Sequence, residues 1–234
     1  MSHSPSGSTA LIIGASRGLG FGMAVEYLKR GWRVVGTVRA NTGTQLHDLA
    51  ERADGKLEIE TVDIVEPDQI MALRERLAGR SFELLFVNAG VANAPEATVE
   101  AVSTEAFIRD MVTNALSPMR VIGSLEGLVP PTGTIGVMSS GLGSVADNDY
   151  GGMEVYRASK AALNTLMRSF AARHADDPRT LLLIAPGWVR TDMGGPNADL
   201  SVEESIANVV DTISRRSGKP GLHYLDYRGH AIRW

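Results

Sequence analysis

The chain has 234 residues, of which 44% are hydrophobic and 21% are charged, so it can bury a large core and lacks the composition of a disordered protein. Its formal net charge of −4 argues against a general nucleic-acid binder, which carries a basic face. The sequence has no cysteine, which excludes disulfides and thiolate chemistry, and its five histidines lie too far apart in sequence to predict a metal site.

The start of the chain predicts a flexible tail over residues 1–8, followed by a single domain over residues 9–234. These first residues lack the basic and then apolar pattern of a secretory signal. Further along, no apolar run approaches the roughly 20 residues that span a membrane. We therefore expect a cytoplasmic protein that has no membrane partner.

Seven short runs rich in Val, Ile and Leu alternate with amphipathic stretches along the chain. The runs predict strands at residues 10–13, 33–38, 57–62, 84–87, 134–138, 181–185 and 222–225. The stretches predict helices near residues 18–30, 67–78, 103–125, 155–174 and 202–215. This order predicts the α/β fold class, with a single Rossmann-type, doubly wound and mostly parallel sheet of about seven strands that has helices on both faces. Ligands of such sheets bind beyond the carboxyl ends of the strands.

The first predicted strand is followed directly by a glycine-rich turn that opens the first helix. The turn reads GASRGLG over residues 14–20, so its glycines have a GxxxGxG spacing. Glycines let the backbone approach a phosphate closely, and a helix N-terminus offers free N–H groups and the positive end of its dipole. We predict that this turn binds the phosphates of a dinucleotide through Gly14, Ser16, Arg17, Gly18, Leu19 and Gly20.

The residues after the second strand predict which nicotinamide dinucleotide is bound. An NAD site places an acidic residue there, which bonds the ribose 2′-hydroxyl. This chain has Arg39 instead, and Arg17 in the glycine turn can reach the same region. Because two guanidinium groups suit a 2′-phosphate, we predict that NADP(H) is preferred over NAD(H).

The glycine turn also matches G-x-S-x-G, the nucleophile elbow of hydrolases, with Ser16 as the nucleophile. That elbow normally follows several strands, whereas only one strand precedes this turn. A hydrolase also needs an acid and a histidine placed for the serine, and nothing in the sequence marks such a pair. Hydrolysis is therefore the weakest of the alternatives.

Tyr156 and Lys160 lie four residues apart in a predicted helix, so they share one helix face. A free phenol has a pKa near 10, too high to exchange protons at neutral pH. A neighbouring ammonium stabilises the phenolate and lowers that pKa, so the pair can donate and accept a proton near neutral pH. We predict that Tyr156 is a general acid/base tuned by Lys160, although an isolated pair of this kind is usually a half-buried tyrosine beside a surface lysine.

Six motifs, spread over almost the whole chain, resemble those of the short-chain dehydrogenase/reductase family and occur in the family's order. They are residues 14–20, Asn88-Ala89-Gly90, Asn114, Ser139-Ser140, Tyr156-x-x-x-Lys160 and residues 186–191 (PGWVRT). The segment between Ser140 and Tyr156 and the stretch 225–234 are similar to the subgroup of C-factor and sniffer-like carbonyl reductases. Val87 stands where the family usually has a first asparagine, a departure that we expect to matter little.

The resemblance implies roles for further residues. Ser140 would donate to the substrate oxygen, with Ser139 as the alternative, and Asn114 would bind a water that links Lys160 to solvent. Lys160 would also hold the nicotinamide ribose, and Asp63 would accept a hydrogen bond from the adenine. The full set of implied cofactor contacts after the glycine turn and Arg39 is Asp63, Ile64, Asn88, Ala89, Gly90, Tyr156, Lys160, Pro186, Gly187, Val189 and Thr191.

These features together predict an NADP(H)-dependent oxidoreductase that interconverts a carbonyl and an alcohol of a small molecule by hydride transfer. The alternative is an NADP(H)-binding signalling or regulatory protein of the C-factor type with little turnover. The short loop after Thr191 suggests an open site, whose candidate substrate contacts are Leu142, Tyr150, Trp188 and Met193. The family also implies a homodimer or homotetramer that assembles through the two long helices, near residues 103–125 and 155–174.

Overall fold

Seven strands form one parallel sheet in the order β3-β2-β1-β4-β5-β6-β7. The strands are β1 (Thr9–Ile13), β2 (Arg33–Val38), β3 (Leu57–Thr61), β4 (Leu84–Val87), β5 (Thr134–Met138), β6 (Thr180–Ala185) and β7 (Gly221–Asp226). Every pair of neighbours runs parallel, which confirms the predicted doubly wound sheet. The strand order reverses between β1 and β4, so the loops that follow these two strands diverge at the carboxyl edge of the sheet.

This computed structural model describes residues 7–40, 43–93 and 95–234. Most of the tail expected over residues 1–8 lies outside the described residues. Its last residue, Ser8, is buried, and its carbonyl accepts a hydrogen bond of 2.9 Å from the amide of Arg33. Ser8 is therefore anchored to the start of β2.

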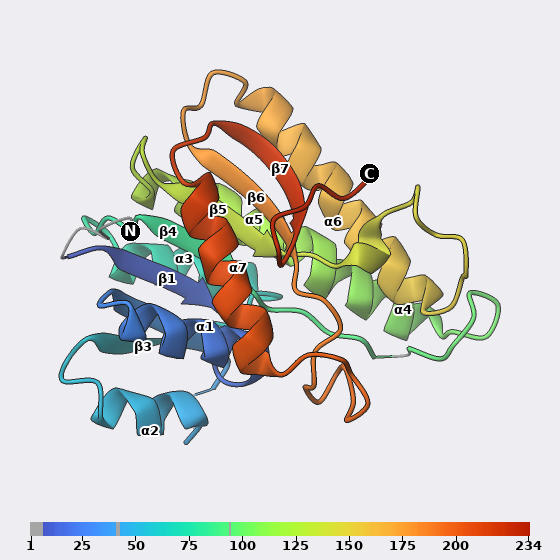
Figure 1. Cartoon of the computed structure of the whole chain (residues 1–234), viewed down its shortest axis with the longest axis horizontal. Coiled ribbons are helices and arrows are strands. Elements are labelled where there is room, and N and C mark those ends of the chain that lie inside the picture. The colour runs from blue at the N-terminus through green and yellow to red at the C-terminus, as the bar shows by residue number, and fades with distance from the viewer. Residues whose placement is uncertain (1–6, 41–42, 94) are drawn as a thin grey trace.

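Helices cover both faces of the sheet, because parallel strands that are apolar on both sides must be shielded on both sides. They are α1 (Gly18–Lys29), α2 (Gln45–Glu51), α3 (Pro67–Arg76), α4 (Thr104–Met111), α5 (Ser117–Leu125), α6 (Glu154–Arg173) and α7 (Val202–Arg216). In Figure 1, α1 and α7 lie side by side across one face. One core contains side chains of α1, α2 and α7, and the other contains side chains of α3, α5 and α6.

Two features of the helices differ from the sequence-based expectations. The first is α2, which is only seven residues long and was not predicted. The Thr44 amide that precedes it donates a hydrogen bond of 3.2 Å to His47 Nδ1. The second is a π-helical turn at Val112–Leu116, which separates α4 from α5 within the stretch predicted as one helix.

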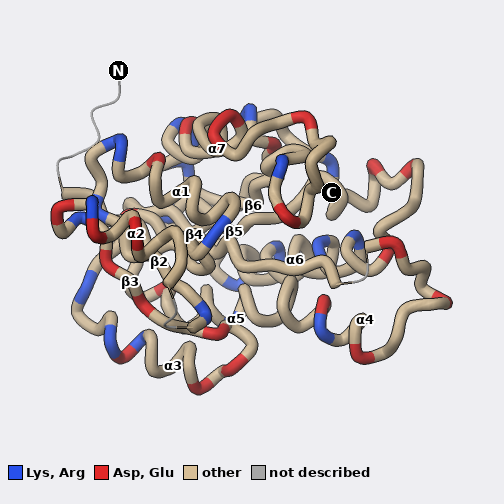
Figure 2. The backbone as a smooth tube through the Cα atoms, turned by 90° about the horizontal axis from the view of Figure 1, so that it is seen from below, with Lys and Arg blue, Asp and Glu red and all other residues tan. Residues whose placement is uncertain are grey.

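Most charged residues lie on helices and loops, and within the sheet β4, β5 and β6 contain none (Figure 2). Acidic and basic residues are interspersed on α3 and α7. Within the part of the chain that the structure describes, no helix is both long enough and apolar enough to cross a membrane.

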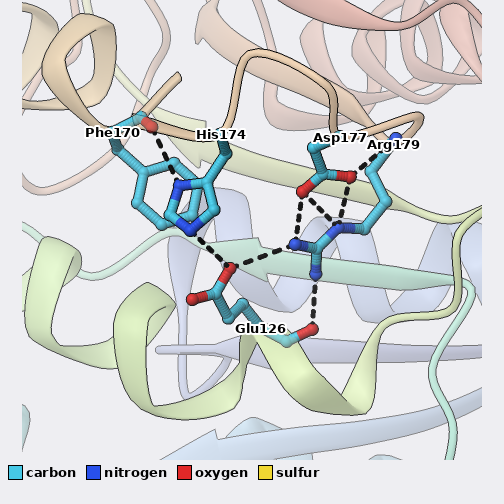
Figure 3. Close-up of polar contacts among 5 residues, drawn as sticks. All are labelled: Glu126, Phe170, His174, Asp177 and Arg179. Atoms are coloured by element: carbon cyan, nitrogen blue, oxygen red, sulfur yellow. Dashed lines mark hydrogen bonds and ion pairs between the residues drawn. The ribbon is translucent and has the colours of Figure 1, made fainter. Parts of the chain in front are cut away.

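Arg179 links three elements near the amino edge of the sheet (Figure 3). Its guanidinium donates to both carboxylate oxygens of Asp177, to the carbonyl of Glu126 at 2.6 Å and to the Glu126 carboxylate at 3.0 Å. His174 Nε2, at the end of α6, lies 3.7 Å from the same Glu126 carboxylate. The network therefore ties the end of α5 and the end of α6 to the residue that precedes β6.

Candidate active site

A cleft of about 1060 Å³ opens at the carboxyl edge of the sheet. It is lined by segments that follow β1, β2, β3, β4, β5 and β6, and by residues of α4 and α6. Among the predicted site residues, Gly20, Asn114 and Tyr150 do not line it. The others do: Gly14, Ser16, Arg17, Gly18, Leu19, Arg39, Asp63, Ile64, Asn88, Ala89, Gly90, Ser140, Leu142, Tyr156, Lys160, Pro186, Gly187, Trp188, Val189, Thr191 and Met193.

The glycine turn packs too closely against β4 to accept side chains. A Cβ atom on Gly20 would stand 2.0 Å from the carbonyl oxygen of Gly14 and 2.6 Å from Asn88 Nδ2. That Asn88 amide donates a hydrogen bond of 2.9 Å to the same Gly14 oxygen. Gly20 therefore acts behind the cleft, by letting α1 start against the turn. Gly14 has a φ of 85°, which favours glycine.

The start of α1 fits a phosphate group. Arg17 caps the helix without a side-chain hydrogen bond, and the first turn contains no acidic residue. The N-terminal N–H groups and the positive end of the helix dipole are thus available to an anion. A Cβ on Gly18, whose φ is 58°, would project towards Thr191, 3.8 Å from its Cγ2, so a side chain here would fill part of the cradle.

Four charged residues that line the cleft bear on the expected binding of a 2′-phosphate: Arg17, Arg39, Asp63 and Asp192. Arg39 is exposed and lines the cleft. Arg17 forms an ion pair with Asp192, which lies in the loop after β6, and both side chains are largely exposed. Asp63 lines the cleft while its Oδ1 accepts a hydrogen bond of 3.1 Å from the Val65 amide. Both expected arginines therefore line the cleft, but Arg17 already has an acidic partner.

Tyr156 and Lys160 lie together on the wall of the cleft that α6 forms. Lys160 Nζ is 5.7 Å from the centroid of the Tyr156 ring and donates a hydrogen bond of 3.0 Å to the carbonyl of Met138. Burial lowers the pKa of Lys160 to about 8. Burial also raises the pKa of Tyr156 to about 12, against the effect of a hydrogen bond with the Ser140 side chain. The expected lowering of the Tyr156 pKa by Lys160 is not seen, because desolvation of the phenol is the largest influence and the Ser140 hydrogen bond is the only effect that lowers the pKa.

The turn after β5 distinguishes the two candidate serines. The Ser139 hydroxyl is buried and donates a hydrogen bond of 2.7 Å to Asn164 Oδ1. The Ser140 hydroxyl lines the cleft, accepts a hydrogen bond of 3.1 Å from the Leu142 amide and bonds with Tyr156. Both serines line the cleft, but the Ser139 hydroxyl is engaged by Asn164, whereas the Ser140 hydroxyl interacts with the phenol.

Asn114 lies behind the cleft, in the π-helical turn between α4 and α5, and is fully buried. Its side chain accepts from the Val91 amide and donates to the Val91 carbonyl, both at 2.8 Å, and it also donates to Ser159 Oγ at 2.9 Å. These bonds tie the loop after β4 to α6. The implied role of Asn114 in holding a water stays a prediction, since its amide group is already paired with protein atoms.

The loop after β6 is held by its own hydrogen bonds. Trp188 Nε1 donates a hydrogen bond of 2.8 Å to the carbonyl of Gly194, and the amide of Gly194 donates one of 3.1 Å to Thr191 Oγ1. Trp188 and Met193 line the cleft and are about half exposed, as expected of candidate substrate contacts. Tyr150 is 94% exposed and lies outside the cleft, so its assignment as a substrate contact is not supported.

The sequence-based analysis missed several residues that line the cleft. They are Asn93, Arg109, Thr113, Met153, Asp226, Tyr227 and Ile232, among others. Tyr227 and Ile232 follow β7 and reach the site because that strand lies at the edge of the sheet beside β6. Their signal in the sequence was the stretch 225–234, which resembled one subgroup of the family. Among the residues that the structure describes, no three acidic or histidine side chains gather as a metal site.

Comparisons with known proteins agree with this geometry. A family model described as short chain dehydrogenase matches residues 8–201. A Burkholderia multivorans protein described as a short-chain dehydrogenase/reductase, solved with bound NADP, is 60% identical, covers 97% of this chain and 99% of its own, and has a TM-score of 0.95. Carbonyl reductase Sniffer of D. melanogaster is 29% identical, with coverage of 97% and 99% and a TM-score of 0.87. C-signal of Myxococcus xanthus is 36% identical over 54% of this chain and 77% of its own length.

Proposed function

Because the chain belongs to the short-chain dehydrogenase family of oxidoreductases, we propose that it interconverts a carbonyl and an alcohol of a small molecule, using NADP(H) and with Tyr156 as the general acid/base. The observation that carries this proposal is that Ser140, Tyr156 and Lys160 line one cleft together with the glycine turn. A protein that only binds a dinucleotide does not need a phenol bonded to a serine hydroxyl beside a buried ammonium.

The chemistry can be written from the side chains. When bound, NADPH supplies a hydride to the carbonyl carbon. Ser140 donates a hydrogen bond to the carbonyl oxygen as negative charge develops there, and Tyr156 transfers its proton to that oxygen. The Lys160 ammonium, 5.7 Å from the ring centroid, stabilises the phenolate that this transfer leaves.

The protonation state of Tyr156 favours one direction. With a pKa of about 12, its phenol is protonated at neutral pH and is ready to donate. Carbonyl reduction needs a proton donor, whereas alcohol oxidation needs the phenolate. The form of Tyr156 that carbonyl reduction requires is therefore the one present at neutral pH.

The preference for NADP(H) rests on Arg17 and Arg39, which both line the cleft, and on the lack of an acidic residue directly after β2. A 2′-phosphate would find two guanidinium groups there, each able to form charge-assisted hydrogen bonds. The relative with bound NADP supports this choice. Comparing kcat/KM for NADPH and NADH tests it, and equal efficiencies would exclude the preference.

The experiment that tests the reaction is Tyr156→Phe, with Tyr150→Phe as the matched control because Tyr150 is exposed outside the cleft. Aliphatic and aromatic aldehydes, ketones and quinones are screened at the NADPH absorbance, and NADPH binding is measured by fluorescence. We expect Tyr156→Phe to lose nearly all turnover and to keep NADPH binding, while Tyr150→Phe keeps both. An unchanged rate in Tyr156→Phe would overturn the assignment.

The second candidate function is that of an NADP(H)-binding signalling or regulatory protein. The likeness to C-signal favours it. The two functions differ in one observable, since a regulatory protein would bind NADPH and would show no turnover across the same screen.

A further inference from the structure

We propose that Tyr224, together with Asn164, is a positioning residue that holds Ser140 in the geometry needed for hydrogen bonding to the substrate oxygen. The inference rests on the proposed function, because it concerns how the Ser140 hydroxyl is placed beside Tyr156. Neither residue lines the cleft, and nothing in the sequence singled out Tyr224.

Ser140 lies where the chain leaves the sheet and has little support from regular structure. The Ser139 amide makes the last hydrogen bond to β6, at 2.8 Å from the Ile184 carbonyl. Ser140 is extended, with a φ of −156°, and opens a single 3₁₀ turn at Gly141–Gly143. The position of the Ser140 hydroxyl therefore depends on contacts that hold the backbone of this short turn.

Tyr224 holds that backbone from β7. Its hydroxyl donates a hydrogen bond to the carbonyl oxygen of Ser140. The same oxygen accepts a hydrogen bond of 3.0 Å from the Gly143 amide. β7 is two strands away from β5, so this bond reaches past β6 to the start of the turn. Tyr224 is 3% exposed, and burial raises its pKa, so its phenol stays a donor.

The Tyr224 ring is itself braced by the last described residues. Its centroid lies 5.3 Å from that of Trp234, and the Arg168 guanidinium stands 4.6 Å above the Trp234 ring. The Trp234 carbonyl accepts a hydrogen bond of 3.0 Å from the Ala146 amide, in the segment that continues from the Ser140 turn. Tyr224 is therefore held at its hydroxyl by Ser140 and against its ring by Trp234, which supports its role in orienting another residue.

Asn164 holds the same turn from α6, one helical turn after Lys160. Its Oδ1 accepts a hydrogen bond of 2.7 Å from the Ser139 hydroxyl, and its Nδ2 donates a hydrogen bond of 3.1 Å to the Gly143 carbonyl. The contact is close, since a Cβ on Gly143 would stand 2.9 Å from Asn164 Nδ2 and 3.0 Å from Lys160 Cβ. Ser139, Ser140 and Gly143 are thus bonded from two separate elements. The helix that carries Tyr156 and Lys160 is thereby fixed to the turn that carries Ser140.

The test compares two tyrosine-to-phenylalanine changes that each remove one buried hydroxyl. Tyr224→Phe removes the bond to Ser140, whereas Tyr27→Phe removes a buried hydroxyl that has no partner among the described residues. A misplaced Ser140 weakens an interaction made in the transition state, so we expect kcat to fall about 10- to 100-fold in Tyr224→Phe. KM for the best carbonyl substrate and Kd for NADPH should stay unchanged, and Tyr27→Phe should match the wild type.

A double-mutant cycle with Ser140→Ala separates positioning from general destabilisation. If Tyr224 acts through Ser140, Tyr224→Phe should change kcat by less than about twofold in the Ser140→Ala background. Asn164→Asp, which loses the donor to Gly143, should show the same loss and the same non-additivity. Thermal unfolding of each variant checks that it is folded under the assay conditions.

The outcomes distinguish a failure of the positioning role of Tyr224 from a failure of the proposed function. A wild-type rate in Tyr224→Phe, or an equal loss with and without the Ser140 hydroxyl, overturns the positioning role and leaves the proposed function standing. A Ser140→Ala variant that turns over normally overturns the role given to Ser140, and the inference falls with it, whereas a wild-type protein with no turnover across the screen overturns the proposed function itself.

Discussion

We predict that removing the charge of Asp192, the ion-pair partner of Arg17, tightens NADPH binding. The two side chains form an ion pair across the cleft, between the glycine turn and the loop after β6. If Arg17 binds the 2′-phosphate, this pair must first break. Asp192→Asn removes the competing charge with almost no change in shape.

The magnitude follows from the exposure of the pair. The Arg17 side chain is 69% exposed and that of Asp192 is 78% exposed, so water screens their attraction strongly. Exposed pairs of this kind contribute about 0.2–1 kcal/mol. We therefore expect Kd for NADPH to fall by a factor of about 1.4 to 5, with a smaller change for NADH, which lacks the 2′-phosphate.

The assay is a fluorescence titration of NADPH and NADH at low ionic strength. Asp176→Asn is the matched control, because Asp176 is an exposed residue between α6 and β6 and its loss changes the net charge equally. Added salt should shrink the difference, since both the pair and the phosphate contact are exposed. The reasoning is refuted if Asp192→Asn weakens NADPH binding, or if Asp176→Asn tightens it as much.

Two further predictions concern stability. The pKa of Lys160 is about 8 in the folded chain, below its usual 10.5. Between these two pH values the unfolded chain binds more protons than the folded chain. The free energy of unfolding should therefore rise with pH across this window, by up to about 3 kcal/mol. Urea unfolding at several pH values should show this rise in the wild type and not in Lys160→Met; parallel slopes would contradict it. The bonds from Arg179 lower the pKa of Asp177, so their contribution is present at neutral pH and is lost as the pH falls towards that lowered value. Arg179→Met should cost about 1–3 kcal/mol at pH 7 and flatten the acid side of the stability curve, and an unchanged curve would rule out the network's role.

The central strands β1, β4, β5 and β6 were predictable because each is a short apolar run with no alternation, which is the pattern of a parallel sheet covered on both faces. The helix α2 could not be predicted, because seven residues with one buried side chain, Leu46, give almost no periodic hydrophobic pattern. The π-helical turn was equally hidden. The turn contains Asn114, which pairs with Val91, and a contact between two segments so far apart leaves no local pattern in the sequence.

The site was predictable where a motif is local. The glycine turn and the Tyr156–Lys160 pair each lie within one segment, and the structure brings both to one cleft. The pKa of Tyr156 could not be predicted from the sequence, because it depends on how deeply the surrounding elements bury the phenol. Tyr224 and the Arg17–Asp192 pair join residues far apart in sequence, so local patterns could not reveal them. The roles of the site residues, the assembly into a homodimer or homotetramer and the cytoplasmic location stay predictions.

The strand order also has a consequence for a chain that is still being synthesised. Every residue of the glycine turn and of the Ser140 turn precedes β6, whereas Tyr224 lies in β7, the last strand to emerge and an edge of the sheet. A ribosome-bound chain that has released β1 to β6 therefore already contains the residues of both turns. It lacks the strand whose tyrosine reaches back over β6 to Ser140, so we expect the Ser140 turn to gain this anchor only when β7 has joined the sheet.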